Sequence, residues 1–148
     1  MIAVALALGV MSARGDESNA DCIERLRLPE YAPLARLAKV TGALRTMITL
    51  DSAGKPGQIR TEYSGPLSRG AGVLLEPNAK LAIQSSTFAA RCAGMTVTVI
   101  FEFVVQGTES SRPTPTYSVG YPHRFWIVTS PAPLTVEQSH VSKDQSPR

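Results

Sequence analysis

The feature that most restricts the fold of this chain is an alternation of apolar side chains across residues 95–105. One side of the segment reads Met95, Val97, Val99, Phe101, Phe103 and Val105, and the other reads Thr96, Thr98, Ile100, Glu102 and Val104. A period of two places the two sets on opposite faces of a β-strand, and β-branched and aromatic residues are typical of strands. The segment therefore predicts a strand whose apolar face is covered by other elements.

Two earlier segments predict a pair of strands joined by a tight turn. The first has Leu44, Thr46, Ile48 and Leu50 on one side, and the second has Ile59, Thr61 and Tyr63 on one side. Residues 51–55 (DSAGK) form a short connection in which Gly54 can take a positive φ. The pattern indicates a hairpin with one face exposed to water.

Apolar residues at helical spacing predict two short helices. The first has its stripe at Tyr31, Leu34, Ala35 and Ala38, and the second has Leu75, Ala79 and Ala82, supported by Leu81 and Ile83. We expect Thr41-Gly42 to end the first helix through a left-handed cap. We expect the second helix from about Glu76 to Ser86, after a loop over residues 67–72. Together with the strands, these helices predict an α+β domain.

A polar connector with several prolines, residues 107–115, follows the long strand. Residues 116–119 and 123–129 are both strand-like and are joined by Gly120-Tyr121-Pro122. We therefore expect a C-terminal β-hairpin over residues 116–131 and a disordered polar tail over residues 132–148.

Residues 1–13 form the only long apolar run, which is too short to cross a bilayer as a helix of about 20 residues. Small side chains before Gly15 and Ala20 suit signal peptidase. We interpret residues 1–15 as a signal peptide, cleaved after residue 15 or 20, and residues 16–28 as a short N-terminal segment. The alternatives are a buried N-terminal helix, or the end of a longer anchor that begins upstream.

The two cysteines, Cys22 and Cys92, both follow the expected cleavage sites. In an oxidising compartment an even pair can cross-link, so export predicts a Cys22–Cys92 disulfide. The chain-entropy model assigns a loop of this length about 4 kcal/mol of stabilisation. The alternative is a pair of buried thiols in a cytosolic protein.

No pattern in the sequence indicates an enzyme, a cofactor or a metal site. Neither His123 nor His140 has another ligand type at metal-binding spacing, no serine lies in a G-x-S-x-G motif, and Gly70-Ala71-Gly72 lacks the rest of a phosphate loop. The net charge is +3, but the 15 basic residues are scattered, so nucleic-acid binding is not expected. The aromatic residues Tyr121, Phe125 and Trp126 either close the end of a core or line a contact.

Several short motifs resemble the C-terminal domain of TonB, the bacterial energy transducer. The family's opening Y-P-x-x-A-R is similar to Tyr31, Leu34, Ala35 and Arg36, with the proline displaced to Pro33. Its entry glycine, hairpin turn and Ser-Gly are similar to Gly42, Leu50-Asp51-Ser52-Ala53-Gly54 and Ser64-Gly65. Its Leu-Leu-x-x-A-x-x-A helix is similar to Leu74, Leu75, Ala79 and Ala82, with Pro77 as a departure; Phe88 follows, and Ser86 stands where the family has Trp.

The resemblance covers residues 29–106 and implies a three-stranded antiparallel sheet with two helices on one face, in the periplasm. It also implies a function, which is to capture an extended segment of a protein partner, such as an outer-membrane receptor, by strand addition. The backbone of residues 95–105 would then provide affinity, and Thr96, Thr98 and Glu102 would influence selectivity. We further expect the hairpin over residues 116–131 to pair with or cover the free edge of the third strand.

The leading hypothesis is therefore a periplasmic or secreted, non-enzymatic binding or scaffold protein. The alternative is a truncated or misannotated TonB energy transducer, which couples inner-membrane energy to transport by outer-membrane receptors. In that case a membrane anchor and a Pro/Lys-rich spacer would lie upstream, and only then would the chain contact a membrane.

Overall fold

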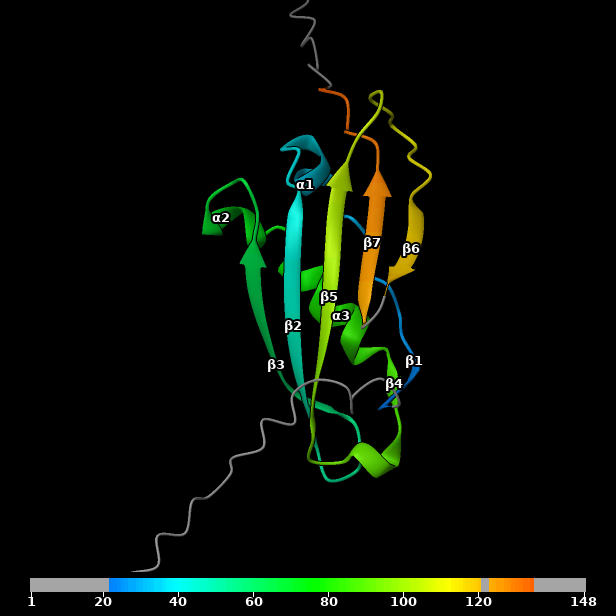
Figure 1. The fold of residues 1–148 in the computed structure, drawn as a ribbon. Helices are drawn as coiled ribbons and strands as arrows, with labels where there is room; N and C mark the ends of the chain where they lie inside the picture. The colour runs from blue at the N-terminus through cyan, green and yellow to red at the C-terminus, as the bar shows by residue number, and fades with distance from the viewer. Residues whose placement is uncertain (1–21, 121–122, 135–148) are drawn as a thin grey trace, which may run out of the picture.

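The computed structural model describes residues 22–120 and 123–134 (Figure 1). Its centre is a mixed sheet of five strands in the order β3-β2-β5-β7-β6. These strands are β2 (Gly42–Leu50), β3 (Pro56–Ser64), β5 (Thr96–Val105), β6 (Thr116–Gly120) and β7 (Arg124–Thr129). The α+β class is confirmed. β2, β3 and β5 lie where alternation predicted strands, and β6 and β7 lie in the two segments expected to form a C-terminal hairpin.

The sheet is larger than the expected three strands because the C-terminal hairpin joins it. β2 pairs antiparallel with β3 on one side and with β5 on the other. β7 pairs with β5 from Ile100 to Val105, and it runs parallel to β5 (Figure 1). The expectation that residues 116–131 would cover the edge of the third strand is confirmed, since β7 occupies that edge and β6 becomes the outer strand.

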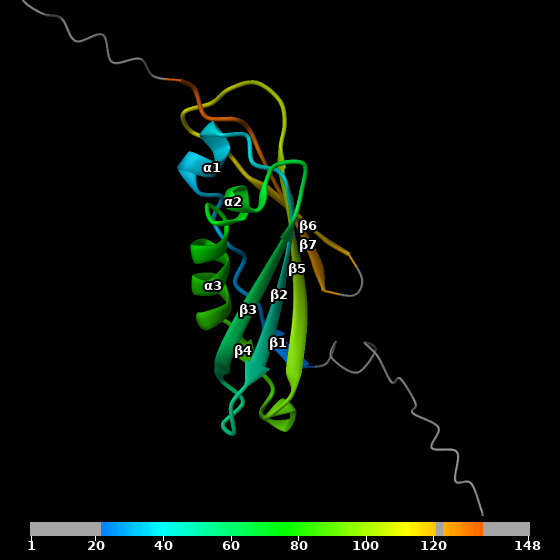
Figure 2. The ribbon, with the colours of Figure 1, turned by 90° about the vertical axis from the view of Figure 1, so that its left-hand side faces the viewer.

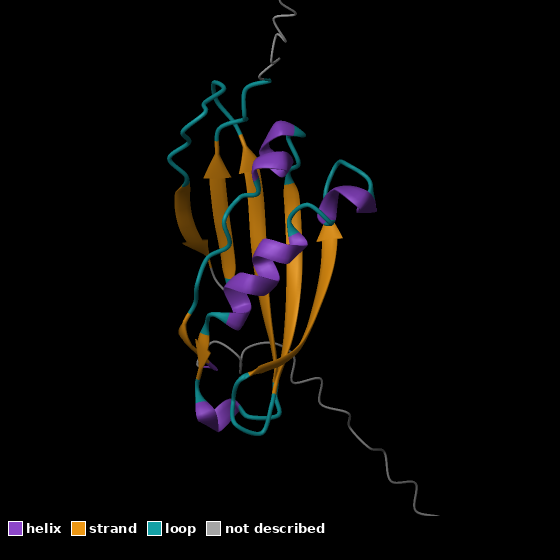
Figure 3. Cartoon of the chain, turned by 180° about the vertical axis from the view of Figure 1, so that it is seen from behind, coloured by secondary structure: helices purple, strands orange, loops and turns teal. Residues whose placement is uncertain are grey.

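Three helices lie on the same side of the sheet (Figures 2 and 3). They are α1 (Pro33–Leu37), α2 (Arg69–Gly72) and α3 (Glu76–Gln84). The short helix α2 falls where a loop was expected. Residue Pro77 lies in the first turn of α3, where its missing N–H costs no intrahelical hydrogen bond.

The hydrophobic core lies between these helices and the covered face of the sheet. Its largest fully buried side chains include Val97, Val99, Phe101 and Phe103 of β5, Leu44 and Ile48 of β2, Leu75 and Ile83 near and in α3, and Ile127 of β7. The alternation in residues 95–105 is therefore explained by this core, because every second side chain of β5 points toward the helices.

The expected stripes on the two helices are partly wrong. Leu34 is 58% exposed and Leu81 is 62% exposed, while Ala79, Ala82 and Ile83 are buried. Each helix lies on the sheet with one side, and Leu34 and Leu81 are on the side that faces solvent. The first helix ends at Leu37, and Lys39, with a φ of 51°, supplies the left-handed residue after it in place of Gly42.

Tyr31 is buried although it precedes α1. Its ring meets that of Phe103 edge-on, with centroids 5.2 Å apart and planes at 86°, a favourable aromatic geometry. Its hydroxyl donates a hydrogen bond to the Val40 carbonyl, and burial raises its pKa well above the ordinary value. The side chain thus connects the segments on both sides of α1 to the core.

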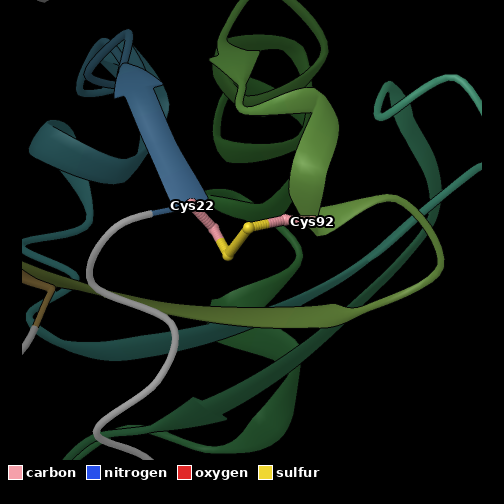
Figure 4. The surroundings of a disulfide bond; sticks show 2 residues. All are labelled: Cys22 and Cys92. Carbon is pink, nitrogen blue, oxygen red and sulfur yellow. A yellow bond between two sulfur atoms is a disulfide. The ribbon is translucent and has the colours of Figure 1, made fainter.

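A disulfide joins Cys22 to Cys92, as predicted (Figure 4). Their Cα atoms are 5.8 Å apart, and both residues are almost fully buried. Cys22 precedes β1 (Ile23–Arg25), which pairs antiparallel with β4 (Thr87–Phe88), and Cys92 ends the short 3₁₀ helix over Ala90–Cys92. The bond fixes the start of the described chain beside the segment that leads into β5.

Arg36 of α1 is a buried cation, with 7% of its surface exposed, and it connects α1 to the segments that flank the C-terminal hairpin. Its Nε donates to the Ser130 carbonyl at 2.9 Å, and its Nη2 donates to the carbonyls of Ser110 at 2.7 Å and Pro131 at 3.4 Å. None of the ion pairs among residues 22–120 and 123–134 involves Arg36. Backbone carbonyls therefore solvate a buried cation and hold residues 110 and 130–131 against α1.

In the part of the chain that the structure describes, no helix is both long and apolar enough to span a membrane.

We predict that the double variant Cys22→Ala/Cys92→Ala unfolds with a free energy about 4 kcal/mol lower than the oxidised protein, because the loop constraint on the unfolded chain is lost. Urea unfolding followed by Trp126 fluorescence measures this difference. Adding a reductant should lower the stability of the wild type only. Equal stabilities with and without the bond would contradict the prediction.

We predict that Arg36→Met lowers the free energy of unfolding by about 2–3 kcal/mol, because charge-assisted hydrogen bonds to buried carbonyls are lost. The matched control is Arg45→Met, since Arg45 is exposed and its nearest ion-pair distance, to Glu62, is 3.9 Å. We expect that control to change stability by less than about 1 kcal/mol. A similar loss in both variants in urea unfolding would contradict the proposed role of Arg36.

Candidate functional site

The outer edge of β3 presents unpaired backbone groups. Within the described residues β3 pairs only with β2, and it ends the sheet on that side (Figure 1). The Leu50 N–H donates to the Met95 carbonyl of the segment that leads into β5. The backbone N–H and C=O groups of Leu50, and of every second residue of β2 before it, therefore point toward β5. The register then directs the N–H and C=O groups of Ile59, Thr61 and Tyr63 away from β2. This edge is open to another strand.

A cleft of about 610 Å³ lies beside this edge. Its walls come from β2, β3 and the junction between the end of α2 and the start of α3. The lining residues are Leu44, Arg45, Thr61, Glu62, Tyr63, Ser64, Gly72, Val73 and Glu76. Val73 is 62% exposed, so an apolar side chain faces solvent at this wall. The cleft thus combines open backbone groups with both apolar and polar side chains.

The Tyr63 ring packs closely against the backbone of three glycines, Gly42, Gly65 and Gly72, beside the cleft. A methyl group built on Gly72 would lie 2.6 Å from Tyr63 Cβ, and one built on Gly65 would overlap the Tyr63 hydroxyl. Gly42 has a φ of +143°, which favours glycine. The Tyr63 hydroxyl donates to the Thr41 carbonyl at 2.7 Å, and burial raises its pKa. The hydrogen bond and the close glycine contacts therefore restrict the position of the Tyr63 ring at the cleft.

Glu76 links α3 to the edge strand. Thr61 Oγ1 donates to Glu76 Oε1 at 2.5 Å, and Lys80 Nζ lies 2.6 Å from the same oxygen. The hydrogen bonds from Lys80 and from Thr61 lower the pKa of Glu76, so the side chain is ionised at neutral pH. This anchor keeps the first turn of α3 next to Thr61 and so maintains the width of the cleft.

The charged side chains that line the cleft are paired with one another or with neighbouring groups. The residues that the structure describes contain no group of three or more His, Cys, Asp or Glu side chains able to hold a metal ion. The carboxylate of Glu76 is already engaged, and Glu62 is exposed beside Arg45. The cleft also offers the outward main-chain donors and acceptors of β3.

The residues expected to form the docking edge, Thr96, Thr98 and Glu102, do not lie on one free edge of the sheet. Glu102 lies where β5 is flanked by β2 and β7, and it forms an ion pair of 3.1 Å with Arg124. This part of β5 is therefore paired on both sides, as the expected position of the hairpin implies, and a partner strand would have to displace β7 to reach it. Thr96 and Thr98 precede the start of β7, at a stretch of β5 that pairs with β2 alone. Thr96 Oγ1 lies 3.3 Å from Thr49 Oγ1.

The aromatic residues of the hairpin divide between the two faces of the sheet. Phe125 packs against the core, 6.2 Å from the ring of Phe101. Trp126 lies on the opposite face, where its ring covers Gly120 closely enough to overlap a methyl group there. Tyr121 is outside the described residues, as is His140. The expected aromatic cluster therefore does not form a single surface.

No family model matches the chain, and no curated protein or solved structure matches it either.

We predict that Glu76→Gln destabilises the protein at neutral pH, because the ion pair with Lys80 is lost. A pKa lowered by folding stabilises the protein above the ordinary value of 4.5, and this stabilisation is lost as the pH falls through the folded-state pKa. The difference in unfolding free energy between wild type and variant should therefore shrink as the pH is lowered below 4.5. Urea unfolding at a series of pH values measures it.

The control for this prediction is a cycle with Lys80→Gln. The two substitutions should be less than additive at neutral pH, since each removes the same ion pair. A difference that stays constant from neutral to acidic pH would contradict the prediction.

Proposed function

We propose that this chain is a non-enzymatic binding protein of the periplasm or the extracellular space, which takes up an extended segment of a protein partner as an additional strand beside β3. The observation that carries the proposal is the open backbone edge at Ile59, Thr61 and Tyr63, with a cleft of about 610 Å³ alongside it. An extended peptide gains main-chain hydrogen bonds from such an edge and selectivity from pockets beside it.

The cellular location is supported by the disulfide. Disulfides form and persist mainly in oxidising compartments, and Cys22–Cys92 is buried in the fold. The resemblance of residues 29–106 to the TonB C-terminal domain points to the same compartment and to strand addition as the mode of contact. It also suggests an outer-membrane receptor as the source of the partner segment.

The choice of β3 follows from the position of the hairpin. Because β7 pairs with β5 along Ile100–Val105, a partner strand would have to displace it to reach that part of β5. No such displacement is needed at β3. Long exposed edge strands are normally shortened, covered or blocked, and β3 is open among the described residues along Ile59–Tyr63, which favours a binding role.

The geometry defines the kind of segment that fits. Side chains of an added strand alternate between the two faces of the sheet. Those on the helix side would meet Thr61, Tyr63 and Val73 in the cleft, and those on the other side would lie near Arg60 and Glu62. We therefore expect an extended sequence with small or apolar residues at every second position.

The test is to select binders from a displayed library of random peptides on the oxidised protein. Bound peptides should protect the amides of Ile59, Thr61 and Tyr63 from hydrogen exchange. Thr61→Pro removes an outward N–H without breaking the ladder with β2, so it should weaken binding roughly tenfold or more. Thr61→Val is the matched control, because it also loses the hydrogen bond to Glu76 but keeps the N–H.

Three results would contradict the proposal. They are a library that yields no binders, equal binding by Thr61→Pro and Thr61→Val, and protection of Thr96 and Thr98 in place of β3. The last result would locate the docking edge on the start of β5.

A further inference from the structure

The opposite edge of the sheet, β6, differs from β3 in its chemistry. Its sequence, Thr116-Tyr117-Ser118-Val119-Gly120, contains no charged residue and no proline, whereas β3 contains Arg60 and Glu62. Val119 is 71% exposed and Tyr117 is 47% exposed. Apart from short length, edge strands are normally protected from pairing with other chains by charges, prolines or bulges. Within the described residues β6 has none of these.

The open backbone groups of β6 belong to the same two exposed residues. β6 pairs antiparallel with β7 in the register Thr116↔Val128, Ser118↔Trp126 and Gly120↔Arg124. The Gln106 N–H donates to the Thr129 carbonyl, so odd-numbered residues of β7 direct their backbone groups toward β5 and even-numbered ones toward β6. The N–H and C=O groups of Tyr117 and Val119 therefore point outward.

We propose that β6 is a self-association edge, at which two copies of this chain pair their β6 strands antiparallel about a two-fold axis through Ser118. In this register Tyr117 of each copy lies opposite Val119 of the other, and their outward backbone groups bond to one another. The two exposed apolar side chains then form aromatic–β-branched cross-strand pairs on the helix side.

The surroundings of β6 are compatible with this pairing. Arg124, opposite Gly120 in the register, is neutralised by Glu102 at 3.1 Å, so no unpaired charge of the hairpin strands opposes a second copy. On the other face, Thr116 of the second copy would lie opposite Gly120, beside the Trp126 ring that covers it. Figures 1 and 3 place β6 at the outer side of the sheet, with no described element beyond it.

Two five-residue strands bury a small area, so the dimer is weak and depends on concentration. Sedimentation velocity over a wide concentration range measures it. Val119→Lys should weaken the dimer roughly tenfold or more, because a charge then occupies the paired edge. The matched control is Leu81→Lys on α3, because Leu81 is similarly exposed at 62% but does not belong to the proposed paired strand, and it should leave the dimer unchanged.

A cross-linking pair tests the register itself. Ser118 faces its two-fold mate as a non-hydrogen-bonded pair, with Cα atoms about 4.5 Å apart, which suits a disulfide. Thr116 is about 13 Å from its mate in the same register. Under mild oxidation Ser118→Cys should therefore form a covalent dimer and Thr116→Cys should not.

A chain that stays monomeric at every concentration, a dimer insensitive to Val119→Lys, or equal cross-linking by both cysteine variants would overturn the proposal. Peptide binding at β3 is measured separately and on the other edge of the sheet, so either idea can fail without the other.

Discussion

The burial of one side of β5 is the interaction on which the other layers depend. Val97, Val99, Phe101 and Phe103 are at most 1% exposed, and burial of each such side chain contributes about 1.5–3 kcal/mol. β5 also pairs with β2 on one side and β7 on the other, so it is the strand that joins the early hairpin to the late one. A net stability of about 5–15 kcal/mol is typical of a domain, so the loss of this one apolar surface would unfold the molecule.

The sequence predicted the positions of the strands well, because the spacing of apolar residues within a segment determines whether that segment forms a strand. Period-two alternation located β2, β3 and β5, the two strand-like segments after the connector located β6 and β7, and an even pair of cysteines predicted the disulfide. The pairing of the hairpin with β5 was expected, but its parallel direction and the choice of β7 over β6 were not, since nothing within β5 specifies them. For the same reason Glu102 was assigned to an edge that β7 occupies, and the open edge at Ile59–Tyr63 was overlooked.

The two edges of the sheet divide the possible contacts of this protein by chemistry. β3 has charged side chains and lies beside a cleft with apolar and polar walls, which suits a guest segment of different sequence. β6 is short and uncharged, and it matches itself. Between them lie three strands with both sides paired for most of their length, so the interior of the sheet offers side chains but few backbone groups to a partner. Among the described residues, open main-chain groups of this sheet are therefore concentrated on its two outer strands and at the start of β5.

Arg36 has a consequence for the order in which the molecule assembles. Its three carbonyl partners follow it by 74 to 95 residues, in segments that flank the last two strands. A chain emerging from a ribosome or a secretion channel can form the β2–β3 hairpin long before those carbonyls arrive. Until then the guanidinium must stay hydrated, which keeps α1 from docking. The contacts of α1 are therefore completed only after residue 131 has emerged, although the hairpin of β2 and β3 ends near residue 64.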